Sequence, residues 1–387
     1  MVKSRNKKKR ELTLILAGLG FIAVVLAILI GYLSRLDKGG PPLPFEEVYA
    51  TSRQLSRDIR LVDKAISDGL YAMGVPQERI VFVSVVPREK DGYHWDFNEI
   101  QARIPRQHPL SQVGDEIRTR VSNLRRPVEI TIAKQSPKEV IYHIYCKGLF
   151  THQLNILRDS YPPPHRLPCP KIGIIIDDVG YDSSLANAFI QLDLALTLSF
   201  LPFAPGSNSI AQKAKQQDRE IMLHLPMEPI NYPAVNPGDG VLLVSMDKGK
   251  ILEVLNRDLS RVPFVSGVNN HMGSRFTASE EKMLVVLTEL KRRGLYFVDS
   301  RTTSRSVAFK VAKRMALRTA SRDIFLDNEL SENALKIQME RLLSLARQKG
   351  WAIGIGHPHQ ETLALLKRYE PTLTHEAEVV PVSRLVN

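Results

Sequence analysis

Two adjacent carboxylates, Asp177 and Asp178, directly follow the apolar run at residues 174–176 and precede the turn residues Val179 and Gly180. A short apolar run that ends at a breaker predicts a buried strand of a parallel sheet. Side chains at the carboxyl end of such a strand lie where open α/β sheets and β/α barrels carry their chemistry. The alternative is that Asp178 or Asp182 caps the following helix.

Three histidines occupy equivalent positions farther along the chain. His224, His271 and His357 each end an apolar, strand-like run and are followed within a few residues by proline or glycine. A hydrolytic zinc site needs three His or carboxylate ligands and an open position for water. It also needs a carboxylate that accepts the water proton and an acid that protonates the leaving group. The three histidines and the aspartate pair match these roles, although any one histidine alone is more simply explained by packing.

Other chemistries lack their sequence signatures. The chain has no Gly-x-Ser-x-Gly elbow and no phosphate-binding glycine loop, which argues against a serine hydrolase and a nucleotide enzyme. Asp299, at the end of another strand-like run, is expected to orient a histidine from behind. Arg275 is expected either to bind a carboxylate or carbonyl of the substrate, or to be an exposed loop residue.

The elements that must position these residues alternate regularly. Strands are predicted at 172–176, 195–200, 220–225, 264–268, 295–298, 324–326 and 351–355, and helices at 184–191, 207–217, 248–259, 279–293, 307–317 and 331–349. This alternation implies an α/β fold with mostly parallel strands and right-handed crossovers. A distorted (β/α) barrel over residues 171–387 fits the strand count, and a doubly wound open sheet is the alternative.

The chain before residue 171 divides by composition. Residues 1–11 form a basic tail, and residues 12–33 are 22 uncharged residues, about the span of a bilayer core. Because the basic residues precede this span, we expect a transmembrane helix with everything after it outside the cytoplasm. A cleaved signal peptide is the alternative, but it would have a shorter apolar region and a cleavage site of small residues. Two linkers, glycine- and proline-rich at 34–44 and proline-rich at 161–170, flank the next domain.

Residues 45–160 are predicted to form a small α+β accessory domain. Helical spacing covers 48–73 and 113–124, and strand-like runs cover 80–86, 94–104, 128–133 and 140–149. Its histidines are scattered and are expected to be structural or at the surface. The domain is interpreted as a spacer or a partner-binding module.

The net charge of +12 does not indicate nucleic-acid binding. The six basic residues before Glu11 supply half of the excess, and the remainder is dispersed without interleaved aromatic residues. The two cysteines, Cys146 and Cys169, are compatible with one disulfide or with two free thiols.

Five segments together resemble a known family. They are Ile176-Asp177-Asp178-Val179-Gly180, His224-Leu225-Pro226-Met227-Glu228, Asn269-Asn270-His271-Met272-Gly273-Ser274, Val298-Asp299-Ser300 and Gly356-His357-Pro358-His359. They look like those of the divergent polysaccharide deacetylases, and the resemblance covers residues 171–387. It implies a distorted β/α barrel that removes N-acetyl groups from an envelope or exported amino-sugar polymer.

Carried over to this chain, the resemblance makes Asp177 the general base, Asp178, His224 and His271 the metal ligands, and His357 the general acid. The His-rich ligand set predicts Zn²⁺ or another divalent transition metal. The chain departs from the mainstream deacetylases, whose His-x-x-x-His turn supplies two ligands, because Glu228 stands four residues after His224. A catalytically silent glycan-binding or scaffold protein of the envelope therefore remains the alternative to a periplasmic, membrane-anchored enzyme.

Overall fold

The computed structural model describes residues 52–387 except 77–78, 105–107 and 159–168. The predicted transmembrane helix at 12–33, the first linker and most of the second lie outside the described residues. Within the described ranges, no helix has the length and apolar character needed to cross a membrane.

The N-terminal part carries a five-stranded sheet with two helices. Its elements are α2 (Ser52–Ala72), β1 (Ile80–Lys90), β2 (Tyr93–Ile104), α3 (Leu110–Asn123), β3 (Val128–Gln135), β4 (Glu139–Cys146) and β5 (Leu149–Arg158). The strand order is β1-β2-β5-β4-β3, and β2 and β5 are the parallel pair. The prediction of one strand over 140–149 is wrong, because Lys147 and Gly148 turn the chain with positive φ and make an antiparallel hairpin.

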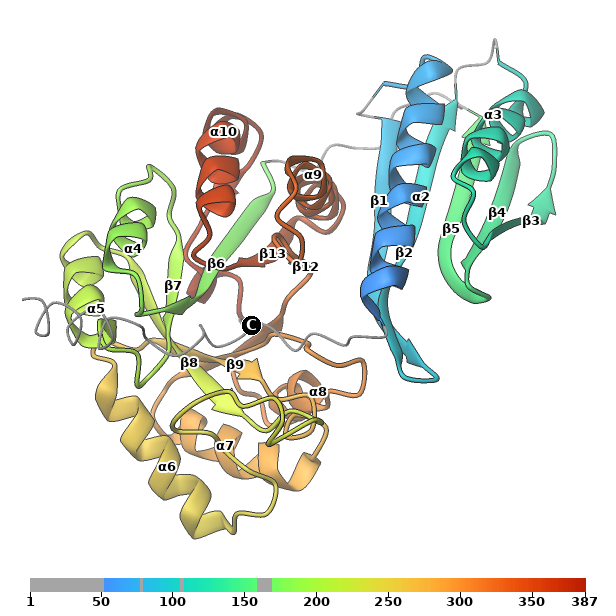
Figure 1. Cartoon of the computed structure of the whole chain (residues 1–387). Coiled ribbons are helices and arrows are strands. Elements are labelled where there is room, and N and C mark those ends of the chain that lie inside the picture. The colour runs from blue at the N-terminus through green and yellow to red at the C-terminus, as the bar shows by residue number, and fades with distance from the viewer. Residues whose placement is uncertain (1–51, 77–78, 105–107, 159–168) are drawn as a thin grey trace, which may run out of the picture. The chain divides into compact units, whose positions relative to one another are not determined.

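The second part contains a sheet in which every strand pairing is parallel. The strand order is β11-β10-β9-β8-β7-β6-β13-β12, with β14 paired to β6. Its strands are β6 (Lys171–Val179), β7 (Thr197–Phe200), β8 (Glu220–Met227), β9 (Gly267–Met272), β10 (Tyr296–Asp299), β11 (Thr319–Ser321), β12 (Ile324–Phe325), β13 (Trp351–Gly356) and β14 (Glu378–Val379). The strands β11 and β12 end this order on opposite sides, so the sheet is an open, half-barrel version of the predicted β/α barrel (Figure 1).

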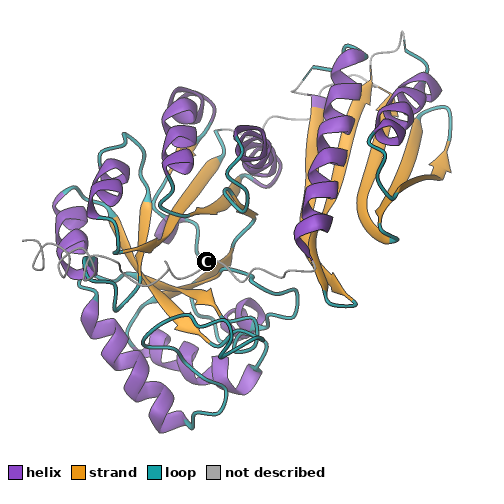
Figure 2. Cartoon of the chain, in the orientation of Figure 1, coloured by secondary structure: helices purple, strands orange, loops and turns teal. Residues whose placement is uncertain are grey.

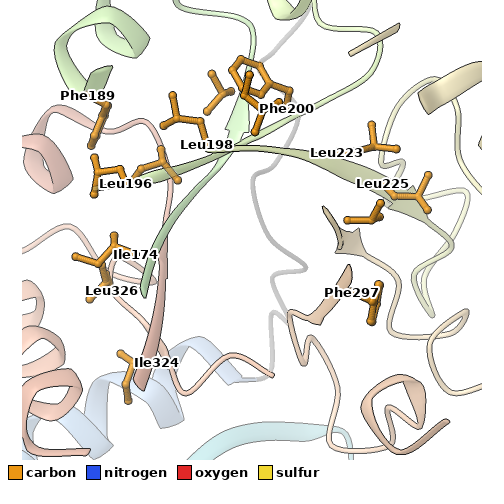
Figure 3. Packing of buried hydrophobic residues seen from close by; sticks show 14 of the residues in the cluster. Ile174, Phe189, Leu196, Leu198, Phe200, Leu223, Leu225, Phe297, Ile324 and Leu326 are labelled. Carbon is orange, nitrogen blue, oxygen red and sulfur yellow. The ribbon is translucent and has the colours of Figure 1, made fainter. Parts of the chain in front are cut away.

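Helices follow the strands and lie outside the curved sheet (Figure 2). They are α4 (Ser183–Ile190), α5 (Ser207–Gln216), α6 (Lys248–Arg261), α7 (Glu280–Arg292), α8 (Ala308–Arg314), α9 (Glu332–Lys349) and α10 (Gln360–Glu376). Alternate strand residues such as Ile174, Leu198 and Leu223 pack outward against these helices in one continuous core (Figure 3). Because successive side chains of a strand point to opposite faces, the residues between these outward ones face the inner side of the sheet.

The inner face of the sheet is filled by the end of the chain. Inward residues of the strands, including Ile175, Met222 and Ile353, form a second core with Val382 and Leu385. Gly173 makes room for this segment, because a Cβ there would lie 2.8 Å from Val382 and 2.9 Å from Leu385. The C-terminus accordingly lies within the curve of the sheet (Figure 1).

One predicted strand boundary needs correction. The prediction of a strand at 264–268 begins too early: Phe264 has φ +62° and a 56% exposed side chain, and β9 starts at Gly267. The strand then continues through His271 to Met272. Both cysteines are free thiols, with Cys146 buried and Cys169 exposed.

Candidate active site

The aspartate pair lies in an irregular end of β6. Between the pairs Ile176↔Leu198 and Val179↔Phe200, β6 carries two residues where β7 carries one. Two residues opposite one define a β-bulge. Within this bulge the backbone of Asp178 is left-handed, with φ +53°. In a regular strand Asp177 and Asp178 would face opposite sides of the sheet. The bulge and the left-handed backbone instead let both carboxylates reach the same histidine, His224.

Strands β8 and β9, which pair with each other beyond β7, each supply one histidine. His224 on β8 is in register with Asn269 on β9, and Pro226 is in register with His271. Met222 belongs to the inner core, so His224, two residues later, continues the inner face of its strand. Asn269 and His271 are likewise two residues apart and share a face. The register thus places two imidazoles and one amide at the carboxyl edge of the sheet.

Three atoms converge there as candidate metal ligands. Asp178 Oδ1 lies 3.1 Å from His224 Nε2 and 3.0 Å from His271 Nδ1, and the two nitrogens are 3.2 Å apart. All three residues are buried, and neither Asp178 oxygen has a hydrogen bond of good geometry among the described residues. Donor atoms about 3 Å apart fit a cation that binds each at about 2.0–2.2 Å. The three side chains therefore fit a divalent metal such as zinc.

The electrostatics of the cluster agree with this fit. Burial alone would raise the pKa of Asp178, but the adjacent His271 and His224 hold it well below its usual range. Burial tends to lower the pKa of His224, and Asp177 and Asp178 overcome that tendency and raise it. Asp178 is thus ionised, and a metal cation would displace the proton that His224 otherwise gains.

Asp177 is placed beside the cluster rather than in it. Its Oδ1 is 3.6 Å from His224 Nδ1, the nitrogen that faces away from Asp178. Asn269 Nδ2 donates to both Asp177 oxygens at 2.8 and 2.9 Å. Burial raises the pKa of Asp177 above its usual value, although His224 and His357 act against the rise. A carboxylate with a raised pKa next to a metal site is suited to accept a proton from water.

His357 follows β13, the other neighbour of β6, and is held by an aspartate. Its Nδ1 lies 2.9 Å from Asp327 Oδ1, and its backbone N–H donates to Asp327 Oδ2 at 2.5 Å. Thr362 also donates to Asp327 Oδ2, at 2.6 Å. Burial alone would raise the pKa of Asp327, but His357 lowers it. The ionised carboxylate keeps a proton on His357 Nδ1 and leaves Nε2 as the nitrogen for proton exchange.

Glu228, at the position of the second histidine of a His-x-x-x-His turn, lies outside the metal cluster. It is buried and accepts hydrogen bonds from Val244 N–H and from Arg275, at 3.0 Å for the arginine. Arg275 thus binds a carboxylate, but one of this chain. The third candidate ligand beside Asp178 and His224 is instead His271, from the adjacent strand β9.

The residues that hold the site side chains in place differ from those expected from the sequence. The expectation that Asp299 orients a histidine is wrong. Among the described residues, the Asp299 carboxylate accepts hydrogen bonds from three other groups: Arg301 N–H, Ser306 Oγ and Phe309 N–H. Asp327, which no sequence motif indicated, is the carboxylate that contacts a histidine, His357. Asn269 belongs to one of the sequence motifs, but the motif did not indicate a role for it. A polar residue two positions before a candidate ligand on the same strand was the available signal.

Residues 174–386 match the divergent polysaccharide deacetylase family. The chain belongs to this family. Over 215 residues it is 35% identical to an uncharacterised protein of Haemophilus influenzae, covering 56% of this chain and 76% of that protein. Over 217 residues it is 32% identical to the uncharacterised protein YibQ of Escherichia coli, covering 56% of this chain and 67% of that protein.

A solved structure has the same fold. The crystal structure of the uncharacterised protein ATU2773 from Agrobacterium tumefaciens aligns with a TM-score of 0.55 at 27% identity, over 58% of this chain and 92% of that one. The family match at residues 174–386 covers the parallel β/α part of the chain, which contains the site. These relatives are themselves uncharacterised, so the substrate must be argued from the residues.

Proposed function

We propose that the protein is a metal-dependent amide hydrolase that removes N-acetyl groups from an amino-sugar polymer of the bacterial envelope. The observation that carries the proposal is the convergence of Asp178, His224 and His271 on one buried point, with a separate carboxylate beside them. A family member that had lost its chemistry would be under no physical constraint to bury these groups together, because burial of unpaired charge is costly.

The residues divide into roles as follows. Asp178, His224 and His271 would hold the cation, for which we propose Zn²⁺ because of the two imidazoles. When bound, the cation supplies Lewis acidity, which makes water nucleophilic near neutral pH and polarises the acetyl carbonyl. Asp177 accepts the proton that water loses when it attacks the carbonyl carbon. His357 gives a proton to the sugar nitrogen as the C–N bond breaks, and the products are acetate and an amine.

The test is acetate release from N-acetylated amino-sugar oligomers by the whole protein, with and without added Zn²⁺. We expect Asp177→Asn to keep its metal and to lose about 10²-fold to 10⁴-fold in kcat, the range for general acid–base groups. We expect His271→Ala to lose the metal itself. The matched control is Asp182→Asn, an exposed aspartate of the next turn that caps α4 through Leu185 N–H, where asparagine caps equally well.

Two outcomes would contradict the proposal. One is a wild-type protein that binds metal but releases no acetate from any such oligomer while retaining affinity for it, which would favour the glycan-binding alternative. The other is an equal metal content in the wild type and His271→Ala, which would show that the cluster is not a metal site.

A further inference from the structure

Asn269 uses both ends of its amide within the site, and its side chain is fully buried. Its Nδ2 donates to both oxygens of Asp177 and lies 3.2 Å from Ser300 Oγ. Its Oδ1 accepts from Ser199 Oγ at 2.6 Å and lies 3.0 Å from His224 Nδ1. One amide therefore contacts both the proposed base and a proposed metal ligand.

The orientation of this amide follows from its partners. An ionised carboxylate only accepts hydrogen bonds, so the NH₂ end must face Asp177 and the oxygen must face Ser199 and His224. An amide oxygen in turn only accepts, so His224 Nδ1 must carry a hydrogen. When a metal displaces the second proton of His224, the remaining nitrogen, Nε2, would offer its lone pair on the side of Asp178 and His271.

We infer that Asn269 is a positioning residue that sets the tautomer of His224 for metal binding and, with its other end, orients Asp177 as the base. The part that concerns the base rests on the proposed hydrolysis, and the part that concerns His224 does not. The sheet supports the inference, because His224 and Asn269 are register partners on adjacent parallel strands. A residue in that register position is fixed by the strand pairing before any metal binds.

The central test compares Asn269→Leu with Asn270→Leu. Asn270 is equally buried in the same strand, but its side chain donates to Met272 C=O and accepts from Ser300 N–H, and none of the hydrogen bonds among the described residues joins it to Asp177 or His224. Loss of an outer partner of a metal ligand typically lowers metal affinity or activity by about 10-fold to 100-fold. We expect Asn269→Leu to lower Zn²⁺ affinity by about 10-fold to 100-fold, and Asn270→Leu to lower it much less. Competition with a chromophoric chelator measures both affinities.

Kinetics give the second readout. Because both ends of the Asn269 amide are already bonded within the protein, we expect Zn²⁺-saturated Asn269→Leu to lose kcat with little change in KM. An equal loss of metal affinity in both leucine variants would show that general disorder of β9 is responsible and would overturn the inference. Unchanged affinity in Asn269→Leu would overturn it as well.

The third readout is measured on the unaltered sequence, and a variant serves only to assign the signal. In Zn²⁺-loaded protein labelled with ¹⁵N-histidine, the His224 signal, identified by its loss in His224→Gln, should show a hydrogen on Nδ1. A hydrogen on Nε2 would overturn the inference. If the wild type releases no acetate, the proposed hydrolysis fails, while metal affinity and the tautomer still decide the role of Asn269 toward His224.

Discussion

Asp258 on α6 is a buried carboxylate that lies outside the candidate metal cluster. Neither of its oxygens has a hydrogen-bond partner among the described residues, and a Cβ on Gly240 would lie 2.8 Å from both. Arg257 Nε is 3.6 Å from Oδ1. Burial raises the pKa of Asp258 to about 7, against smaller lowering effects of Arg257 and Arg261.

The raised pKa of Asp258 should make the free energy of unfolding depend on pH. Between about pH 4 and pH 7 the folded state binds more protons at this group than the unfolded state does, so the free energy of unfolding falls as the pH rises through that window. Asp258→Asn removes the titration. We expect the variant to be more stable than the wild type at pH 8, by up to about 4 kcal/mol, and to lose that advantage near pH 4.

Urea unfolding of both proteins at several pH values measures this difference. A stability difference that stays constant from pH 4 to pH 8 would contradict the prediction, because a simple change in packing does not titrate.

At the scale of residues, the sequence was sufficient to predict which side chains lie near the carboxyl ends of the strands. Asp177, Asp178, His271 and His357 lie within two residues of such an end and His224 lies three residues before one, and parallel strands bring their carboxyl ends to one edge of the sheet. Their roles remain predictions. Asn269 and Asp327 were missed for a physical reason: one requires the register of β8 with β9, and the other pairs with a histidine 30 residues away. Neither relation appears as a local pattern.

At the scale of elements, the turn from β6 to α4 positions the aspartate pair. Gly180 has φ +141°, and a Cβ there would overlap Ser207 Oγ and lie 2.6 Å from Ala204 Cβ. Its C=O accepts from Gly206 N–H at 2.8 Å, which joins this turn to the start of α5. The backbone of the bulge therefore depends on close packing against the next βα unit.

We expect Gly180→Ala to destabilise the protein by about 1–3 kcal/mol, since it combines an unfavourable φ with overpacking. The matched control is Gly294→Ala, where φ is +73° but no atom lies within 4 Å of the added Cβ. That variant carries the backbone cost alone, about 1 kcal/mol. Thermal unfolding should lower Tm more for Gly180→Ala, and equal shifts would contradict a packing role for Gly180.

Element types were easier to predict than their limits. Alternation of apolar runs and helical spacing was enough for α4 to α9, because each buries one face on the sheet. The hairpin between β4 and β5 was missed, because Lys147 adopts a left-handed conformation that its residue type does not announce. The segment containing Val382 and Leu385 was missed as well, since its place on the inner face is set by the curvature of the whole sheet.

At the scale of the whole molecule, the proposed substrate requires a location that the sequence alone predicts. Six basic residues precede the 22 uncharged residues at 12–33, and a glycine- and proline-rich linker follows at 34–44. We propose that residues 12–33 cross the cytoplasmic membrane once, because basic residues are retained on the cytoplasmic side. The linker would then tether the described part of the chain in the periplasm, within reach of an envelope polymer.

Protease treatment of spheroplasts tests this topology. We expect digestion of the chain beyond residue 40, while the intact protein fractionates with membranes and resists extraction by carbonate, because a spanning apolar helix is not released by salt or high pH. A variant without residues 1–33 is the control, and it should remain soluble inside the cell and protected from the protease. A shortened soluble form that begins after residue 33 would replace the anchor by a cleaved signal while retaining export. Protection of the full-length chain would place the site on the cytoplasmic side, away from any exported polymer, and so would remove the substrate proposed for it.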